Sequence, residues 1–219
     1  MVKDLRAELD FPLFDLHLFQ TSEGMRSKVL SDLGYPPTSS TGFYSGRSKM
    51  AYVWRNKSFN AMLEVISHEA THALLRSGYP RIPKWLNEGL AEYFENIEVY
   101  SNAVAVPPAA GWVRKYKQFR SDGKLLPLSE FLTLNSKQWL AYDGDGHAGY
   151  TQSWAVVFYL MSTDEGREVV ARLLNSVKHE ASSPCCFEQI GLFYPAGISG
   201  LEEHVAQWVE IRTHTKHRY

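Results

Sequence analysis

The chain has 219 residues, of which 44% are hydrophobic, and a chain of this length and composition can bury a substantial core. Lysine and arginine number 23 against 24 aspartate and glutamate, so its charge indicates neither a nucleic-acid partner nor an anionic membrane surface. The longest apolar runs, such as residues 155–161, are far shorter than the roughly 20 residues of a membrane-spanning helix. We therefore expect one folded domain, with no nucleic-acid partner and no membrane-spanning segment.

The beginning of the sequence and its cysteines leave the compartment open. Residues 1–10 mix charged and single apolar residues, and they lack the apolar core of a secretory signal. We expect a cytoplasmic protein, or one of the cell envelope or periplasm from which a signal has been removed. Cys185 and Cys186 are neighbours and cannot join distant segments, so a reduced pair is the simpler interpretation and a redox role the alternative. The sequence does not indicate an oligomeric state.

The first half of the chain predicts strands and helices in alternation. In chain order we expect a strand over residues 11–20, a helix over 22–33, a strand over 42–54, and helices over 58–76 and 84–97. Gly34 is positioned to end the first helix, and Ser58 or Asn60 to cap the second. In the second strand, Met50, Tyr52 and Trp54 should share one face.

The second half of the chain predicts mainly helices. Residues 101–124 contain two prolines and two glycines, and they predict a long connection with a short helix over 112–119. Further helices are expected over 129–134, 150–162, 165–177, 185–192 and 199–213. The fold class is therefore α+β, with a lobe at 1–100 that carries a small sheet and a mainly helical lobe at 101–219 within one domain.

His68 and His72 are the ends of an HExxH pattern in the helix expected over residues 58–76. Histidines four residues apart project from the same side of a helix, so two imidazole nitrogens can reach one ion. Zinc accepts such nitrogens at about 2.0 to 2.1 Å, and a catalytic zinc needs a third protein ligand and an open position for water. Glu69 lies beside the first histidine, where it could take the proton of that water.

A pattern this short also occurs by chance on solvated helices, so its neighbours matter. Apolar residues surround it, namely Val65, Ile66, Ala70, Ala73, Leu74 and Leu75. This predicts a largely buried helix, on which histidines require partners.

The segment 85–95 offers the missing ligand. Glu88 and Glu92 lie one helical turn apart on the same face, although an exposed acidic stripe would have the same spacing. Gly89 and Ala91 are small, and a glycine costs about 1 kcal/mol in a helix interior unless something offsets it. Close packing of another helix against Gly89 would offset this cost.

Together, HExxH at 68–72 and WLNEGLAEYFE at 85–95 resemble the gluzincin zinc metallopeptidases, most closely the peptidase MA-like gluzincins of bacteria. A later Tyr, Gln, Ser segment of that family is similar to residues 150–155. The resemblance implies a zincin-like lobe with the metal-binding helix, and zinc as the cofactor. It implies the following roles: His68, His72 and Glu88 as metal ligands, Glu69 as general base, and Glu92 and Asn87 as hydrogen-bonding groups around the ligands.

Two features depart from the large gluzincin aminopeptidases. Fifteen residues separate His72 from Glu88, which is shorter than in those enzymes, and no GxMEN-like exopeptidase signature is present. Both features disfavour an aminopeptidase.

Tyr150 follows a polar loop at 143–147 and should open a helix near the metal site. In related enzymes a tyrosine or histidine donates to the oxyanion, so Tyr150 is the candidate donor and His147 its rival; a tyrosine that only packs in the core is the alternative. The Asp-Gly-Asp-Gly run of this loop lacks the other oxygen ligands of an EF-hand, so we expect a turn and not a calcium site. The strand that ends near Trp54 could pair with an extended peptide, or pack its aromatic face in the core.

The predicted function is zinc-dependent hydrolysis of a peptide bond in a peptide or protein substrate. One alternative keeps the metal chemistry but uses an amide of a cell-wall peptide. Another is a zinc-binding interaction domain without catalysis, which Glu69 disfavours because a structural site needs no base.

Overall fold

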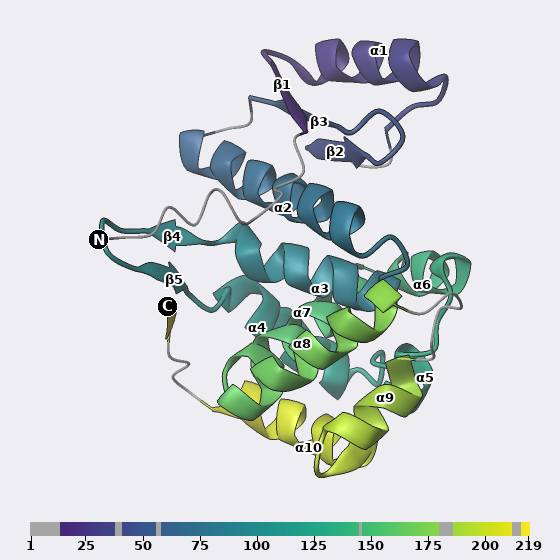
Figure 1. Cartoon of the computed structure of the whole chain (residues 1–219), viewed down its shortest axis with the longest axis vertical. Helices are drawn as coiled ribbons and strands as arrows, with labels where there is room; N and C mark the ends of the chain where they lie inside the picture. The colour runs from purple at the N-terminus through teal and green to yellow at the C-terminus, as the bar shows by residue number, and fades with distance from the viewer. Residues whose placement is uncertain (1–13, 38–40, 56–57, 145, 180–185, 212–215) are drawn as a thin grey trace. The chain divides into compact units, whose positions relative to one another are not determined.

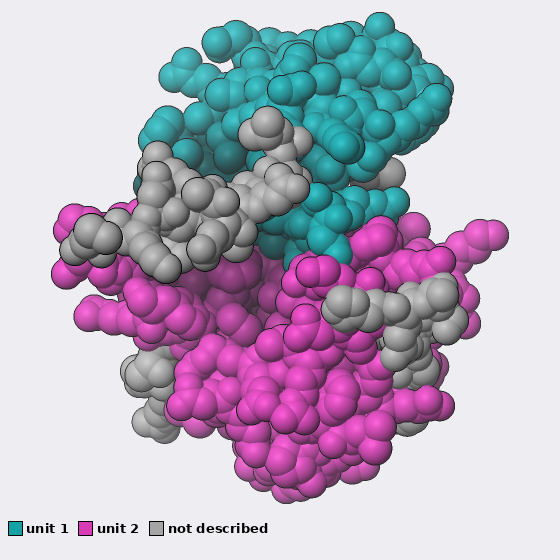
Figure 2. All heavy atoms as spheres, viewed as in Figure 1, with its two compact units in different colours: residues 1–78 teal, residues 79–219 magenta. Residues whose placement is uncertain are grey.

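A computed structural model describes residues 14–37, 41–55, 58–144, 146–179, 186–211 and 216–219, which form ten helices and two small sheets. The expected α+β class is confirmed, and helix predominates. The chain divides into two compact units, residues 1–78 and 79–219, which Figure 2 distinguishes by colour. Helix α3 (Lys84–Glu95) belongs to the second unit, whereas the sequence-based boundary near residue 100 groups it with the first. None of the described helices is long and apolar enough to cross a membrane.

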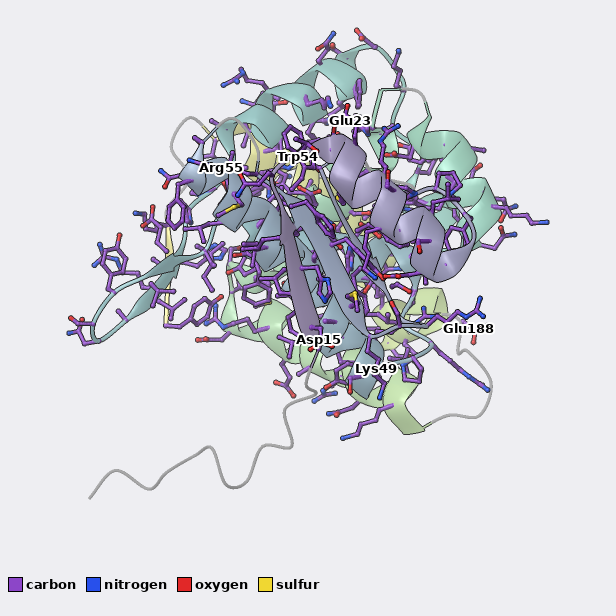
Figure 3. The ribbon with its side chains drawn as sticks, turned by 90° about the horizontal axis from the view of Figure 1, so that it is seen from above. Asp15, Glu23, Lys49, Trp54, Arg55 and Glu188 are labelled. Carbon is purple, nitrogen blue, oxygen red and sulfur yellow. The ribbon has the colours of Figure 1, made fainter. Side chains whose placement is uncertain are left out.

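The first unit contains a three-stranded sheet in the order β1-β3-β2. Strands β1 (Asp15–Phe19) and β3 (Met50–Trp54) are parallel, and β2 (Gly42–Ser45) is antiparallel to β3. Figure 3 shows Asp15 and Lys49 at one end of the β1 and β3 pair, and Trp54 and Arg55 at the other end. The expectation of a single strand over 42–54 was wrong, because a turn at 46–49 with Lys49 in the left-handed region (φ 54°) folds the segment into a hairpin.

Helices α1 (Ser22–Leu33) and α2 (Phe59–Gly78) cover opposite faces of this sheet (Figure 1). α1 has the predicted bounds, with Thr21 accepting a hydrogen bond from the Gly24 N–H (3.1 Å) and Gly34 ending the helix at φ 80°. Tyr52 forms a core with three residues of α1, and Met50 and Trp54 pack against it, as expected for that face of the strand. The core residues on α1 are Met25, Val29 and Leu33.

α2 begins where predicted, with the Ser58 hydroxyl accepting from the Ala61 N–H at 3.1 Å. Its buried residues are Glu69, Thr71, Ala73 and Leu75. Leu63 and Leu74 are exposed, so the expectation of a largely buried helix was wrong for them. A helix that packs one stripe on a small sheet leaves such positions on its outer surface.

β3 lies between β1 and β2, so the expectation that this strand could pair with an extended peptide was wrong. Its backbone groups are paired with neighbours on both sides. An extended peptide therefore cannot pair with the strand that ends at Trp54, and the aromatic face of this strand packs in the core instead.

The second unit contains the remaining elements. Its further helices are α4 (Ala110–Ser121), α5 (Leu128–Phe131), α6 (Ser136–Asp143), α7 (Ala148–Met161), α8 (Asp164–His179), α9 (Cys186–Phe193) and α10 (Gly197–Glu210). Its antiparallel sheet has the order β4 (Glu98–Val99), β5 (Val104–Val106), β6 (His217–Arg218). The expected long connection over 101–124 was wrong in part, because it contains β5 and a longer α4. α6 was not predicted, although Asn135 and Gln138 form a capping box at its start.

α7 is the central helix of the second unit and packs against α3, α4, α6, α8 and α10 (Figure 1). Most of its residues are buried, Trp154 and Phe158 among them. A Cβ atom on Gly89 would lie 2.5 Å from Val157 Cγ2 and 2.7 Å from the Ser153 carbonyl oxygen. The close helix packing predicted for Gly89 is confirmed, and it occurs between α3 and α7.

Candidate metal centre

His68 and His72 project from one side of α2, one turn apart, as their spacing predicts. Their Nε2 atoms lie 3.1 Å apart, and the two rings are nearly perpendicular, at 84°. Two nitrogens at about 2.05 Å from a tetrahedral zinc would be about 3.3 Å apart. The separation is therefore close to that of two ligands of one zinc ion, and it is also the separation of a hydrogen bond between the two rings.

Glu69 is buried on α2 beneath the start of β2. A Cβ atom on Gly42 would lie 3.1 Å from Glu69 Oε1 and 2.4 Å from Val65 Cγ1. A side chain at position 42 would therefore overlap first with Val65 and would also crowd the Glu69 carboxylate. The importance of Gly42 was not predicted from the sequence, because a glycine at the start of a strand is also common in turns.

Glu88 lies on α3 with only 2% of its side chain exposed. Lys84, one turn earlier, places its Nζ atom 2.5 Å from Glu88 Oε1. The same ammonium group lies 5.2 Å from the centre of the Trp139 ring. The buried carboxylate therefore has a cationic partner on its own helix.

Tyr150 lies in the first turn of α7, with its ring edge-on to Trp139 at 5.0 Å. Burial raises the pKa of its phenol far above the ordinary value, and the charges of Glu88, Glu92 and Asp143 and a hydrogen bond with Glu88 act in the same direction. A tyrosine phenol already keeps its proton at neutral pH at its ordinary pKa of about 10, and the raised pKa extends this to higher pH, so the phenol is a hydrogen-bond donor.

The neighbours of Tyr150 have structural contacts. His147 is the left-handed residue before α7 (φ 69°), and its side chain is 64% exposed with Nδ1 3.4 Å from Asp143 Oδ2. Asp143 Oδ1 accepts from the Tyr150 N–H at 3.1 Å, which is the geometry of a turn, while Asp145 lies outside the described residues.

Gln152 of α7 has two side-chain hydrogen bonds. It accepts from the Tyr142 hydroxyl (2.7 Å) and donates to the Leu126 carbonyl (2.6 Å). Gln152 therefore anchors α7 to the preceding segment.

Glu92 and Asn87 are the other two residues of α3 that the sequence singled out. Glu92 is 6% exposed, and its Oε2 accepts a hydrogen bond from the Trp112 indole N–H at 2.8 Å. Asn87 is partly buried in the first turn, where its backbone N–H donates to the Pro83 carbonyl at 2.9 Å. The roles expected for both side chains stay predictions.

The chain matches a family of proteins. The family described as "Protein of unknown function (DUF1570)" matches residues 62–182, more than half of the chain. The chain belongs to the DUF1570 family. The region matched by DUF1570 contains the HExxH segment of α2 and the whole of α3, α4 and α7. No curated protein and no solved structure matches the chain.

Lys84 and Trp112 are two residues of the DUF1570 region that were not predicted to belong to the site. Lys84 has a local signal, since a lysine and a glutamate four residues apart on a helix often pair. Trp112 has none, because it reaches Glu92 from another helix, 20 residues further along the chain.

Proposed function

We propose that this DUF1570 protein is a zinc-dependent hydrolase that cleaves peptide bonds. In this proposal His68, His72 and Glu88 bind the zinc, and Glu69 is the general base. The main observation in support of this proposal is the separation of 3.1 Å between the two histidine Nε2 atoms, which is close to the separation of two ligands of one tetrahedral ion.

Two further observations support the choice of ligands. Two imidazoles and a carboxylate are a common ligand set of catalytic zinc. α2 and α3 are also consecutive helices, separated by residues 79–83 alone.

The chemistry divides between the ion and the side chains. A bound zinc ion supplies a Lewis acid that makes a water molecule acidic near neutral pH and polarises a carbonyl group. Glu69 would take a proton of the water as the water oxygen bonds to the carbonyl carbon, and would pass that proton to the departing nitrogen, so that the C–N bond breaks and a carboxylic acid and an amine form. Tyr150 donates a hydrogen bond to the oxygen that becomes negatively charged, a role for which its retained proton suits it.

The arrangement of the first unit is also compatible with the proposed zincin-like fold. Its HExxH helix lies against a small sheet, and a second helix covers the other face. We therefore propose that the protein is similar in fold and chemistry to the peptidase MA-like gluzincins. The substrate is accordingly a peptide or protein.

Metal analysis tests the proposal. After zinc reconstitution and removal of loose metal, the wild-type protein should retain about one zinc per chain. His72→Ala should lose most of it, and Glu69→Gln should retain it, because the latter substitution replaces a base and not a ligand. A control variant, His17→Ala, removes a histidine of β1 and should retain zinc. Full zinc retention in His72→Ala would refute the ligand set.

A further inference from the structure

We infer that Trp112 is a positioning residue of the proposed zinc site and acts through Glu92. The inference rests on the proposed function and on the role that the gluzincin resemblance implies for Glu92, a hydrogen bond to a histidine ligand. Its basis is the hydrogen bond of 2.8 Å from Trp112 Nε1 to Glu92 Oε2, which joins α4 to α3.

The bond links the indole to a buried carboxylate. Glu92 is 6% exposed, so water cannot easily replace a partner that is lost. A hydrogen bond from a neutral N–H group to a charged oxygen is stronger than one between neutral groups. The indole binds Oε2, and this bond restrains the rotation of the carboxylate and with it the direction of Oε1.

Trp112 is itself held in place. Its backbone N–H donates to the Ala109 carbonyl at 2.9 Å in the first turn of α4. Lys115, three residues later, places its Nζ atom 4.9 Å from the centre of the indole ring. α4 packs against α7, the helix that also packs against α3. The donor to Glu92 therefore lies on a supported helix.

Other tryptophans show that such a bond is not a general feature of buried indoles in this protein. Within the described part of the chain, the indole N–H groups of Trp85 and Trp139 are buried and have no hydrogen-bond partner. Trp85 lies on α3, the helix that carries Glu92, and is 1% exposed. Trp85→Phe is therefore a matched control, because it removes an indole N–H group that bonds to nothing among these residues.

The effect should appear in metal affinity. Loss of a side chain that directly orients a ligand usually weakens metal binding about 10 to 100 fold, which is our expectation for Glu92→Ala. Trp112 acts one residue further from the metal, so we expect Trp112→Phe to weaken zinc binding about 3 to 10 fold. Phenylalanine keeps an aromatic ring and removes the donor.

The experiment is a competitive zinc titration against a chelator on five proteins: wild type, Trp112→Phe, Glu92→Ala, the double variant and Trp85→Phe. Trp112→Phe should weaken binding, and Trp85→Phe should bind zinc as the wild type does. In the Glu92→Ala background, Trp112→Phe should not weaken zinc binding further, because the effects of two residues that act through one another are not additive. A role of Trp112 in packing alone would give additive losses.

The outcomes separate this inference from the proposed function. Wild-type affinity in Trp112→Phe, or a full additional loss in the Glu92→Ala background, would overturn the inference alone. A wild-type protein that binds no zinc would overturn the proposed function and the inference with it. NMR of the metal-free protein tests the hydrogen bond directly: the Trp112 indole N–H resonance should move upfield in Glu92→Gln, and an unchanged resonance would also refute the role of Trp112.

Discussion

Lys84 places its ammonium nitrogen 2.5 Å from Oε1 of Glu88 and thereby gives a buried carboxylate a charged partner. Removal of one partner from a fully buried ion pair typically destabilises a protein by about 3 to 5 kcal/mol, because the other charge is left buried. The Lys84 side chain is 29% exposed, so solvent screens part of this effect.

We expect Lys84→Met to lower the free energy of unfolding of the metal-free protein by about 1 to 3 kcal/mol. The loss should be smaller in zinc-loaded protein, since a bound cation would also neutralise Glu88. Urea unfolding with and without zinc measures both values. Arg172→Met is the control, because it breaks an exposed pair with Glu168 and should change stability by less than about 0.5 kcal/mol. Equal losses in the two variants would contradict this account of the pair.

Gly89 permits close contact between α3 and α7. Gly89→Ala should lower the free energy of unfolding by about 1 to 3 kcal/mol, because a Cβ atom would lie 2.7 Å from a backbone oxygen that cannot move aside cheaply. The matched control is Gly191→Ala in α9, where a Cβ atom would meet nothing within 4 Å. That substitution should be neutral or stabilise the protein by up to about 1 kcal/mol. Denaturant unfolding compares them, and equal effects would contradict the packing argument.

Helix α1 shows what the sequence could predict. Its bounds follow from local signals, an N-cap at Thr21 and a left-handed glycine at position 34. The hairpin at 42–54 was missed because its turn contains Lys49 at positive φ, a conformation that lysine rarely adopts. In the sheet of β4, β5 and β6, the first two strands form a local hairpin of very short strands, whereas β6 was missed because it lies more than 100 residues after β5 in the chain. Pairing over that distance leaves no local pattern.

The same division between local and distant signals applies to the candidate site. The spacing of His68 and His72 alone predicted that their nitrogens converge. The bond between Glu92 and Trp112 depends on how α3 and α4 pack, which no spacing within one helix reveals. Gly42 was also missed, because its importance lies in the space that it leaves for two side chains of α2, Val65 and Glu69.

His217 should make stability depend on pH. Its Nδ1 atom lies 2.7 Å from the Tyr93 hydroxyl, and its ring lies 4.4 Å from that of Phe158. Burial, and then the charge of Arg167, lower the pKa of His217 to about 4. Below the unfolded pKa of about 6.5 the unfolded chain binds a proton that the folded chain does not, so stability falls as the pH decreases from about 6.5 to about 4.

We therefore expect the wild-type protein to lose more stability between about pH 7 and about pH 5 than His217→Phe, which keeps an aromatic ring and cannot titrate. Urea unfolding at both pH values provides the comparison. If the two proteins lose stability equally over this range, His217 does not carry the pH dependence.

Tyr150→Phe separates a catalytic phenol from one that only holds Glu88. If the phenol donates to the oxyanion as proposed, turnover on a cleaved peptide should fall about 100 to 1,000 fold while zinc affinity and melting temperature change little. The measurements are steady-state kinetics, a zinc titration and thermal unfolding. Weaker zinc binding or lower stability with turnover retained would assign the hydrogen bond with Glu88 as the function of the phenol. A parallel His147→Ala variant tests the rival donor.

The central claim is that Glu69 activates water for peptide hydrolysis, and a comparison of zinc-loaded wild type with zinc-loaded Glu69→Gln on a peptide library tests it most directly. Glutamine cannot accept the proton of the water, whereas it has nearly the size of glutamate and should preserve the fold beside Gly42. The account predicts that the wild type cleaves peptides and that Glu69→Gln, with equal zinc content, loses nearly all of this activity. Equal cleavage by both proteins, or no cleavage of any peptide by the zinc-loaded wild type, would contradict it.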